Sequence, residues 1–158
     1  MVRDIPSEDR VAMTFGERNT WVSAFILPAT SIAYFAVVLP RLRDQPASEV
    51  SWVSPMLWAI GASIVGTIVG VIVVSIAAGI ANRGVLESKE DIRDKQIGRY
   101  GDRIAQAITG FGGAAVLVLV MFEVDYFWIG NTLFLIGSIG ATWGAIAKIR
   151  AYHGAFHG

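Results

Sequence analysis

The chain has 158 residues, of which 54% are apolar and 16% are charged, with thirteen basic and thirteen acidic side chains and no cysteine. A soluble domain carries about 25% charged residues, so this composition favours a membrane protein. The zero net charge argues against nucleic-acid binding. The lack of cysteine excludes disulfides, thiolate catalysis and cysteine metal sites.

Four apolar stretches follow one another along the chain, at about 21–39, 57–78, 105–122 and 127–149. A helix rises about 1.5 Å per residue, so about 20 apolar residues span the ~30 Å hydrocarbon core of a bilayer. The sequence therefore predicts an all-α, polytopic protein of the plasma membrane. We expect a single domain over residues 1–158 with four transmembrane helices surrounded by lipid.

The basic residues predict how the chain crosses the membrane, because Lys and Arg mark the cytoplasmic side. Eleven of the thirteen lie in the amino-terminal segment, the loop 82–104 and the carboxyl end, which share one side of a four-pass protein. The other two are Arg41 and Arg43. We therefore expect both termini and the loop 82–104 in the cytoplasm.

Two similar segments precede the first and third apolar stretches. Asp9-Arg10 with Phe15-Gly16-Glu17-Arg18 is matched by Asp94-Lys95 with Tyr100-Gly101-Asp102-Arg103, at an offset of 85 residues from Asp9 to Asp94. This offset suggests a tandem repeat of a two-helix hairpin, related by an axis along the membrane normal. Chance similarity between small membrane helices is the alternative.

The second of these segments is also a candidate surface for a partner. Ser88 followed by acidic residues is typical of a helix start, and Ile97, Tyr100, Ile104 and Ile108 follow at helical spacing. We expect one helix that runs from the cytoplasm into the bilayer. Its charged residues form the candidate docking set, which is Asp91, Arg93, Asp94, Lys95, Arg99, Asp102 and Arg103. A solvated helix start is the alternative.

Small residues recur at helical spacing in the second and fourth apolar stretches. Small side chains let helix backbones approach closely in lipid. The candidate packing residues are Ser63, Gly66 and Gly70 in the second stretch and Gly137, Gly140, Ala141 and Gly144 in the fourth. We expect these two helices to pack against each other or across a homodimer interface.

No ionisable side chain lies near the middle of any apolar stretch, which argues against proton or sodium coupling. The main polar side chains available inside the membrane are Tyr34, Asn131 and Thr142. His153 and His157 have the spacing of a helical metal pair, but two ligands do not make a site. We therefore expect no catalytic residues, no metal and no cofactor.

Several segments together resemble a family of small, uncharacterised, four-helix membrane proteins from archaea and actinobacteria. The family typically has Asp-Glu-Arg-Asp before the third helix and Phe-Trp-x-x-Asn at the start of the fourth, and Ile92 stands where it has glutamate. The resemblance implies an architecture but no activity. It is carried by Phe15-Gly16-Glu17-Arg18-Asn19-Thr20-Trp21, Asp91-Ile92-Arg93-Asp94-Lys95-Gln96-Ile97, Gly101-Asp102-Arg103, Phe127-Trp128-Ile129-Gly130-Asn131 and Lys148-Ile149-Arg150-Ala151-Tyr152.

These observations favour a non-enzymatic accessory or regulatory protein that binds another membrane protein, or a second copy of itself as a homo-oligomer. The alternative is a small channel or carrier for an uncharged or hydrophobic solute. A continuous polar cavity lined by Tyr34, Asn131 and Thr142 would favour the alternative. A tightly filled bundle with one exposed apolar face would favour the accessory role.

Overall fold

The computed structural model describes residues 13–81 and 92–154. Its long helices are α1 (Phe15–Val38), α2 (Val53–Ala81), α3 (Ile92–Met121) and α4 (Tyr126–His153). Two short 3-10 helices, η1 (Leu39–Arg43) and η2 (Ala47–Glu49), connect α1 to α2. All four long helices are long and apolar enough to cross a membrane. The expectation of an all-α protein with four spans is therefore confirmed.

Each long helix is longer than its predicted apolar stretch, because the helix continues into residues that flank the stretch. The 30 residues of α3 correspond to a length of about 45 Å, well over the thickness of the hydrocarbon core. This helix is unbroken through Gly98 and Gly101, whereas Ser88 and Asp91 lie outside the described residues. At the start of α1, the hydroxyl of Thr14 accepts a hydrogen bond of 3.2 Å from the backbone N–H of Glu17.

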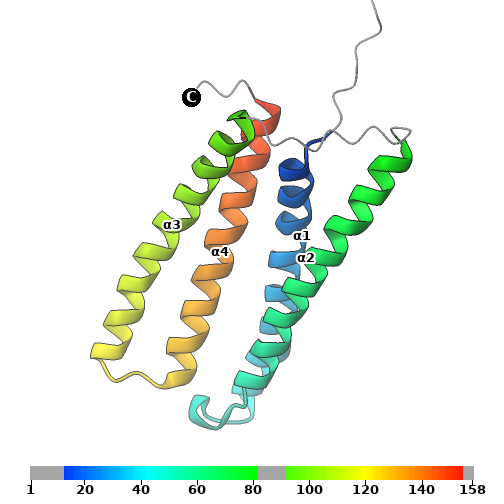
Figure 1. Ribbon diagram of the computed structural model, residues 1–158. Helices are drawn as coiled ribbons and strands as arrows, with labels where there is room; N and C mark the ends of the chain where they lie inside the picture. The colour runs from blue at the N-terminus through cyan, green and yellow to red at the C-terminus, as the bar shows by residue number, and fades with distance from the viewer. Residues whose placement is uncertain (1–12, 82–91, 155–158) are drawn as a thin grey trace, which may run out of the picture.

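The four helices form a row in the spatial order α2, α1, α4, α3 (Figure 1). The first and last helices of the chain, α1 and α4, lie side by side in the middle, with α2 packed on α1 and α3 packed on α4. We call the end that holds Thr14 and His153 the terminal end. The opposite end, where α1 joins α2 and α3 joins α4, is the loop end.

This order does not support the expected tandem repeat. An axis along the membrane normal that related the two hairpins would exchange α1 with α3 and α2 with α4. The contact between α1 and α4 would then need an equivalent contact between α2 and α3. Those two helices instead occupy opposite edges of the row. The similar segments before α1 and α3 are therefore not accompanied by repeated packing.

The best-packed apolar cluster lies at the loop end. Val38 and Phe127 have no exposed surface, and Tyr34 and Val50 are 3% and 4% exposed. These side chains come from α1, α4 and the connection between α1 and α2. The cluster therefore fixes the connection against the two central helices.

A tight turn joins α3 to α4 and makes them antiparallel neighbours. Glu123 has a φ of 53°, the left-handed conformation in which helices often end. The backbone N–H of Val124 donates to the carbonyl of Leu119, and that of Glu123 donates to the carbonyl of Val120, as in a Schellman motif. Asp125 then caps α4 by accepting a 2.8 Å hydrogen bond from the N–H of Phe127.

Glycines bring α3 and α4 into backbone contact. A Cβ atom on Gly144 would lie 2.9 Å from the carbonyl oxygen of Gly101, and one on Gly101 would lie 2.7 Å from the carbonyl oxygen of Gly144. A Cβ atom on Gly140 would lie 2.9 Å from Oγ1 of Thr109. Toward the loop end, Ile136 packs directly on Gly112. A side chain at Gly101 or Gly144 would meet backbone and force the two helices apart, whereas one at Gly112 or Gly140 would first displace the side chain of Ile136 or Thr109.

The expected contact between the small residues of α2 and those of α4 is not present, because α1 lies between the two helices. A Cβ atom on Gly66 would meet Ile26 of α1 at 3.3 Å, and one on Gly70 would meet Val22 of α1 at 2.6 Å. Gly140 and Gly144 face α3 instead. Gly66 and Gly70 thus pack against α1, and Gly140 and Gly144 against α3, because the hairpin turns place those helices next to each other.

We expect Gly140→Leu to lower the free energy of unfolding by about 1–3 kcal/mol, the usual effect of overpacking. The measurement is reversible unfolding of the purified protein in mixed detergent micelles. Gly61→Leu is the matched control, because a Cβ atom on Gly61 meets nothing within 4 Å. Equal stability of the two variants would contradict the role of Gly140 in the α3–α4 contact.

The orientation of the row in the membrane is a prediction from charge that single cysteines can test. The chain has no native cysteine, and Ser48 at the loop end and Gly154 at the terminal end are both exposed. In intact cells, a membrane-impermeant maleimide should label Ser48→Cys and leave Gly154→Cys unlabelled until the cells are opened. The reverse pattern would contradict cytoplasmic termini.

Candidate functional site

A polar concavity lies at the terminal end, between α1, α4 and α3. It has a volume of about 260 Å³, and we call it the terminal crevice. Its wall on α1 carries polar side chains, its mouth carries an ion pair between α3 and α4, and its floor is apolar. The lining residues are Asn19, Thr20, Ser23, Leu27, Asp102, Ala105, Ala141, Gly144, Ala145 and Lys148.

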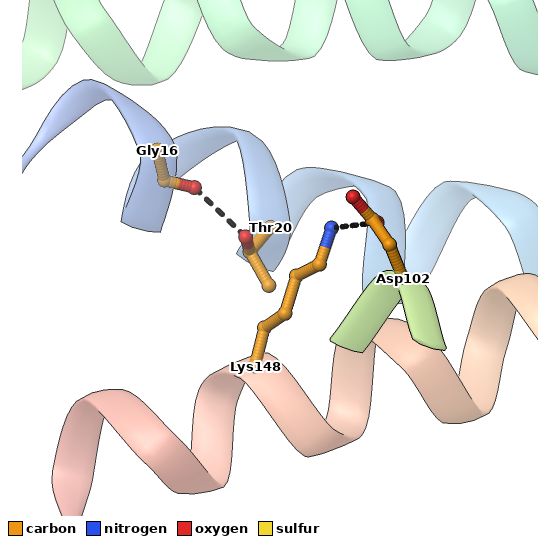
Figure 2. Close-up of polar contacts among 4 residues, drawn as sticks. All are labelled: Gly16, Thr20, Asp102 and Lys148. Carbon is orange, nitrogen blue, oxygen red and sulfur yellow. Dashed lines mark hydrogen bonds and ion pairs between the residues drawn. The ribbon is translucent and has the colours of Figure 1, made fainter. Parts of the chain in front are cut away.

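The ion pair joins Lys148 of α4 to Asp102 of α3. The ammonium group donates to Oδ1 of Asp102 at 2.8 Å. In Figure 2, Lys148 extends from α4 and its ammonium group lies between Thr20 and Asp102. The two side chains are 25% and 59% exposed, and such partly exposed pairs contribute about 0–1 kcal/mol to stability. The pair is therefore a weak stabiliser of the fold, and both charges are accessible from the crevice.

The crossing of Gly101 and Gly144 positions this ion pair. The aliphatic part of Lys148 lies directly over Gly101, so a Cβ atom there would lie 2.6 Å from Cε of the lysine. Because the α3 backbone sits this close, the neighbouring Asp102 comes within reach of the ammonium group. The local sequence Gly101-Asp102 thus supplies both the close approach and the counter-ion.

Polar side chains of α1 form the opposite wall. The hydroxyl of Thr20 donates to the carbonyl of Gly16 at 2.8 Å (Figure 2). Its oxygen keeps acceptor capacity toward the crevice. Asn19 and Ser23 lie on the same wall. The crevice therefore combines one cation, one anion and several neutral hydrogen-bonding groups.

A second concavity continues the first along the seam between α1 and α4. It has a volume of about 200 Å³ and shares Leu27 and Ala141 with the terminal crevice. We call it the seam cavity. It reaches α2 and is lined by Leu27, Thr30, Ser31, Ala59, Ser63, Phe134, Gly137, Ser138 and Ala141. Three of the predicted packing residues, Ser63, Gly137 and Ala141, thus line a cavity.

The two central helices are joined by side-chain hydrogen bonds inside the membrane. The hydroxyl of Tyr34 donates to Oδ1 of Asn131 at 2.7 Å, and the amide of Asn131 donates to the carbonyl of Phe127 at 2.8 Å. Nearer the terminal end, the hydroxyl of Ser138 donates to that of Ser31 at 2.6 Å. These bonds satisfy polar groups that lipid cannot.

The three polar residues expected inside the membrane do not line one cavity. Tyr34 and Asn131 are 3% and 5% exposed and bond to each other within the cluster at the loop end. Thr142 lies eleven residues beyond Asn131, about 16 Å along α4. It lines a different, largely apolar concavity with Ser31 and Ser138. Tyr34, Asn131 and Thr142 therefore do not line one continuous path.

The predicted docking residues also divide into separate groups. Asp91 lies outside the described residues. Asp94 is 7% exposed and hydrogen-bonds to Tyr152, which also bonds to Thr14, so it joins the starts of α1 and α3 to the end of α4. Asp102 pairs with Lys148. The exposed basic members on α3 are Arg93, Lys95, Arg99 and Arg103.

Reasoning from sequence did not identify the terminal crevice. The available signal was the spacing of Thr20, Ser23, Leu27, Ser31 and Tyr34, which places four polar side chains on one face of the first helix. Among residues 13–81 and 92–154, no three His, Asp or Glu side chains gather as metal ligands. His157 lies outside those ranges.

No family model matches the chain, and no curated protein or solved structure matches it either. The four spans, the packing and the polar sites together define a multi-pass integral membrane protein. The family suggested by the sequence motifs stays an interpretation.

We expect Tyr34→Phe to lower the free energy of unfolding by about 0.6–1.7 kcal/mol, from the average to the largest contribution known for a hydrogen bond between membrane helices. The variant removes the donor and leaves Oδ1 of Asn131 without it. The matched control is Tyr126→Phe, because Tyr126 is 83% exposed. Unfolding of both variants in mixed micelles is the measurement, and equal values for the two would contradict a stabilising Tyr34–Asn131 bond.

Proposed function

We propose that this protein is a non-enzymatic accessory subunit that binds a helix of another membrane protein, or of a second copy, along the outward face of α3. The observation that carries the proposal is the incomplete packing of α3. In the apolar segment of α3, 6% of residues are buried, against 11% in α2 and 17% in α1 and in α4. The edge helix α3 thus leaves most of its apolar segment unburied within the chain and available to a neighbour.

The outward face of α3 has the composition of a helix-packing surface. Ala107, Gly110 and Ala114 are exposed, and a Cβ atom on Gly110 or Gly113 would meet nothing within 4 Å. Glycine disfavours a helix interior by about 1 kcal/mol relative to alanine, and Gly110 gains no close contact within the chain in return. Close approach by an external helix would account for glycine at this position.

The charged part of α3 supports a partner with acidic groups next to the membrane. Arg93, Lys95, Arg99 and Arg103 are exposed within the first twelve residues of α3, whereas Asp94 is buried and Asp102 is paired. The described part of this surface is therefore mainly basic. Charges of opposite sign on the partner would fix the register of the apolar contact.

The alternative role, a small channel or carrier for an uncharged or hydrophobic solute, has weaker support. It needs a continuous polar path, and the contact between Tyr34 and Asn131 fills the centre of the row at the loop end. Liposomes that contain the protein are expected to be no more permeable to small uncharged solutes than empty liposomes.

The test is purification of the intact protein from its native membrane in a mild detergent, followed by native mass spectrometry. We expect a stoichiometric complex with a second membrane protein or a second copy. Gly110→Leu should weaken that complex by about tenfold or more, which corresponds to about 1.4 kcal/mol. Gly61→Leu, on the other edge helix, should leave it intact.

A wild-type protein that is isolated only as a monomer would contradict the proposal. So would a complex that survives Gly110→Leu unchanged, because the contact would then lie elsewhere on the row. Circular dichroism of each variant shows whether its helices are retained.

A further inference from the structure

The polar end of the terminal crevice presents two opposite charges at one place. The ammonium group of Lys148 has three N–H donors, of which one bonds to Asp102 at 2.8 Å. Asp102 is 59% exposed, so its carboxylate can accept from an additional donor. The side chains of Asn19 and Thr20 face the same space. The site thus matches a ligand group that itself carries a negative and a positive charge.

The apolar part of the site continues from the same place. The terminal crevice and the seam cavity share the lining residues Leu27 and Ala141, so they are adjacent along the seam between α1 and α4, and we call the two together the groove. The volumes of about 260 and 200 Å³ together fall within the ~300–1,000 Å³ typical of ligand sites. Ala59, Phe134 and Gly137 line the far end of the groove.

The length and the depth of the groove match one leaflet of the bilayer. Lys148 precedes Ile149 and Arg150 at the end of the last apolar stretch, where a lysine side chain reaches the interface. From Thr20 to Ser31 the groove follows α1 for eleven residues, or about 16 Å. Half of a ~30 Å hydrocarbon core is about the same length. A charged end at the interface and an apolar end near the midplane are the two parts of a membrane lipid.

We propose that this groove binds one phospholipid with an amine-bearing, zwitterionic headgroup. The lipid phosphate accepts from the ammonium group of Lys148, the lipid amine donates to the carboxylate of Asp102, and one acyl chain lies along Leu27 and Ala141. A headgroup with a net negative charge and no amine fits less well, because it has no cation to pair with the carboxylate of Asp102. A free phosphate ion would leave the apolar part of the groove empty.

The experiment uses the full chain, purified in detergent and supplied with lipids of identical acyl chains. The probes are phosphatidylethanolamine and phosphatidylglycerol, and native mass spectrometry counts the lipids retained per chain. We expect the wild-type protein to retain one phosphatidylethanolamine, with a preference of about tenfold over phosphatidylglycerol. Equal retention of the two lipids would overturn the assignment of the headgroup.

Variants separate the two ends of the groove. Gly137→Leu places a large side chain in the seam cavity, where a Cβ atom meets nothing within 4 Å, and should abolish retention of the lipid. Gly61→Leu makes the same change at an open position of α2 that does not line the groove, and should retain the lipid as the wild type does. Retention by Gly137→Leu, or loss in both variants, would contradict the groove as the site.

Charge variants test the headgroup contacts through the preference for one lipid over the other. A variant that only disturbs the fold would lower the retention of both lipids without changing that preference. Asp102→Asn should remove the preference for phosphatidylethanolamine by raising the retention of phosphatidylglycerol. Lys148→Gln should lower the retention of both lipids. An unchanged preference in Asp102→Asn would overturn the proposed contact with the lipid amine. If Gly137→Leu does not fold, Ser63→Leu fills the same cavity from the wall on α2 and has the same expected result.

Discussion

The backbone crossing of α3 and α4 at Gly101 and Gly144 is the contact on which the rest of the structure depends. Membrane helices gain no hydrophobic free energy by associating, because lipid is as apolar as their side chains. Close packing must supply the attraction, and at this crossing a Cβ atom on either glycine would lie under 3 Å from the carbonyl oxygen of the other. The same approach brings Asp102 to Lys148 and provides the third wall of the terminal crevice.

Polar contacts likewise hold two helices together at the centre of the row. The Tyr34–Asn131 and Ser31–Ser138 hydrogen bonds join α1 to α4. Each gives a partner to polar groups that would otherwise have none in hydrocarbon. These contacts are specific in direction, whereas the apolar contacts around them are not. The two kinds of contact together select one order of helices from the several that four apolar helices would permit.

The four spans were predictable because the lengths of the apolar runs match the thickness of a bilayer, a constraint that acts on each helix separately. The lateral order was not, because it depends on which surfaces meet. Gly66 and Gly144 both indicate close packing, but nothing in either stripe states that the first faces α1 and the second faces α3. The short connection between α3 and α4 requires these two helices to be neighbours, and the packing agrees.

The candidate site was less predictable than the fold for a related reason. Asp94 and Asp102 have the same charge and similar positions in the sequence, yet one is buried against Tyr152 and the other bonds to Lys148. Their roles follow from the neighbours that the fold gives them. Thr20 and Ser23 have the spacing of one helix face, but the cavity beside them needs α3 and α4 before it exists.

The central position of the first and last helices has a consequence for the order of assembly during synthesis. The amino-terminal hairpin of α1 and α2 enters the membrane before α4 has been made, so Ser31 and Tyr34 then lack the partners that they have in the finished protein. The hairpin of α3 and α4 has its own glycine contacts and can form independently. This arrangement predicts that the contacts between α1 and α4 form last, when the two hairpins join at the centre of the row.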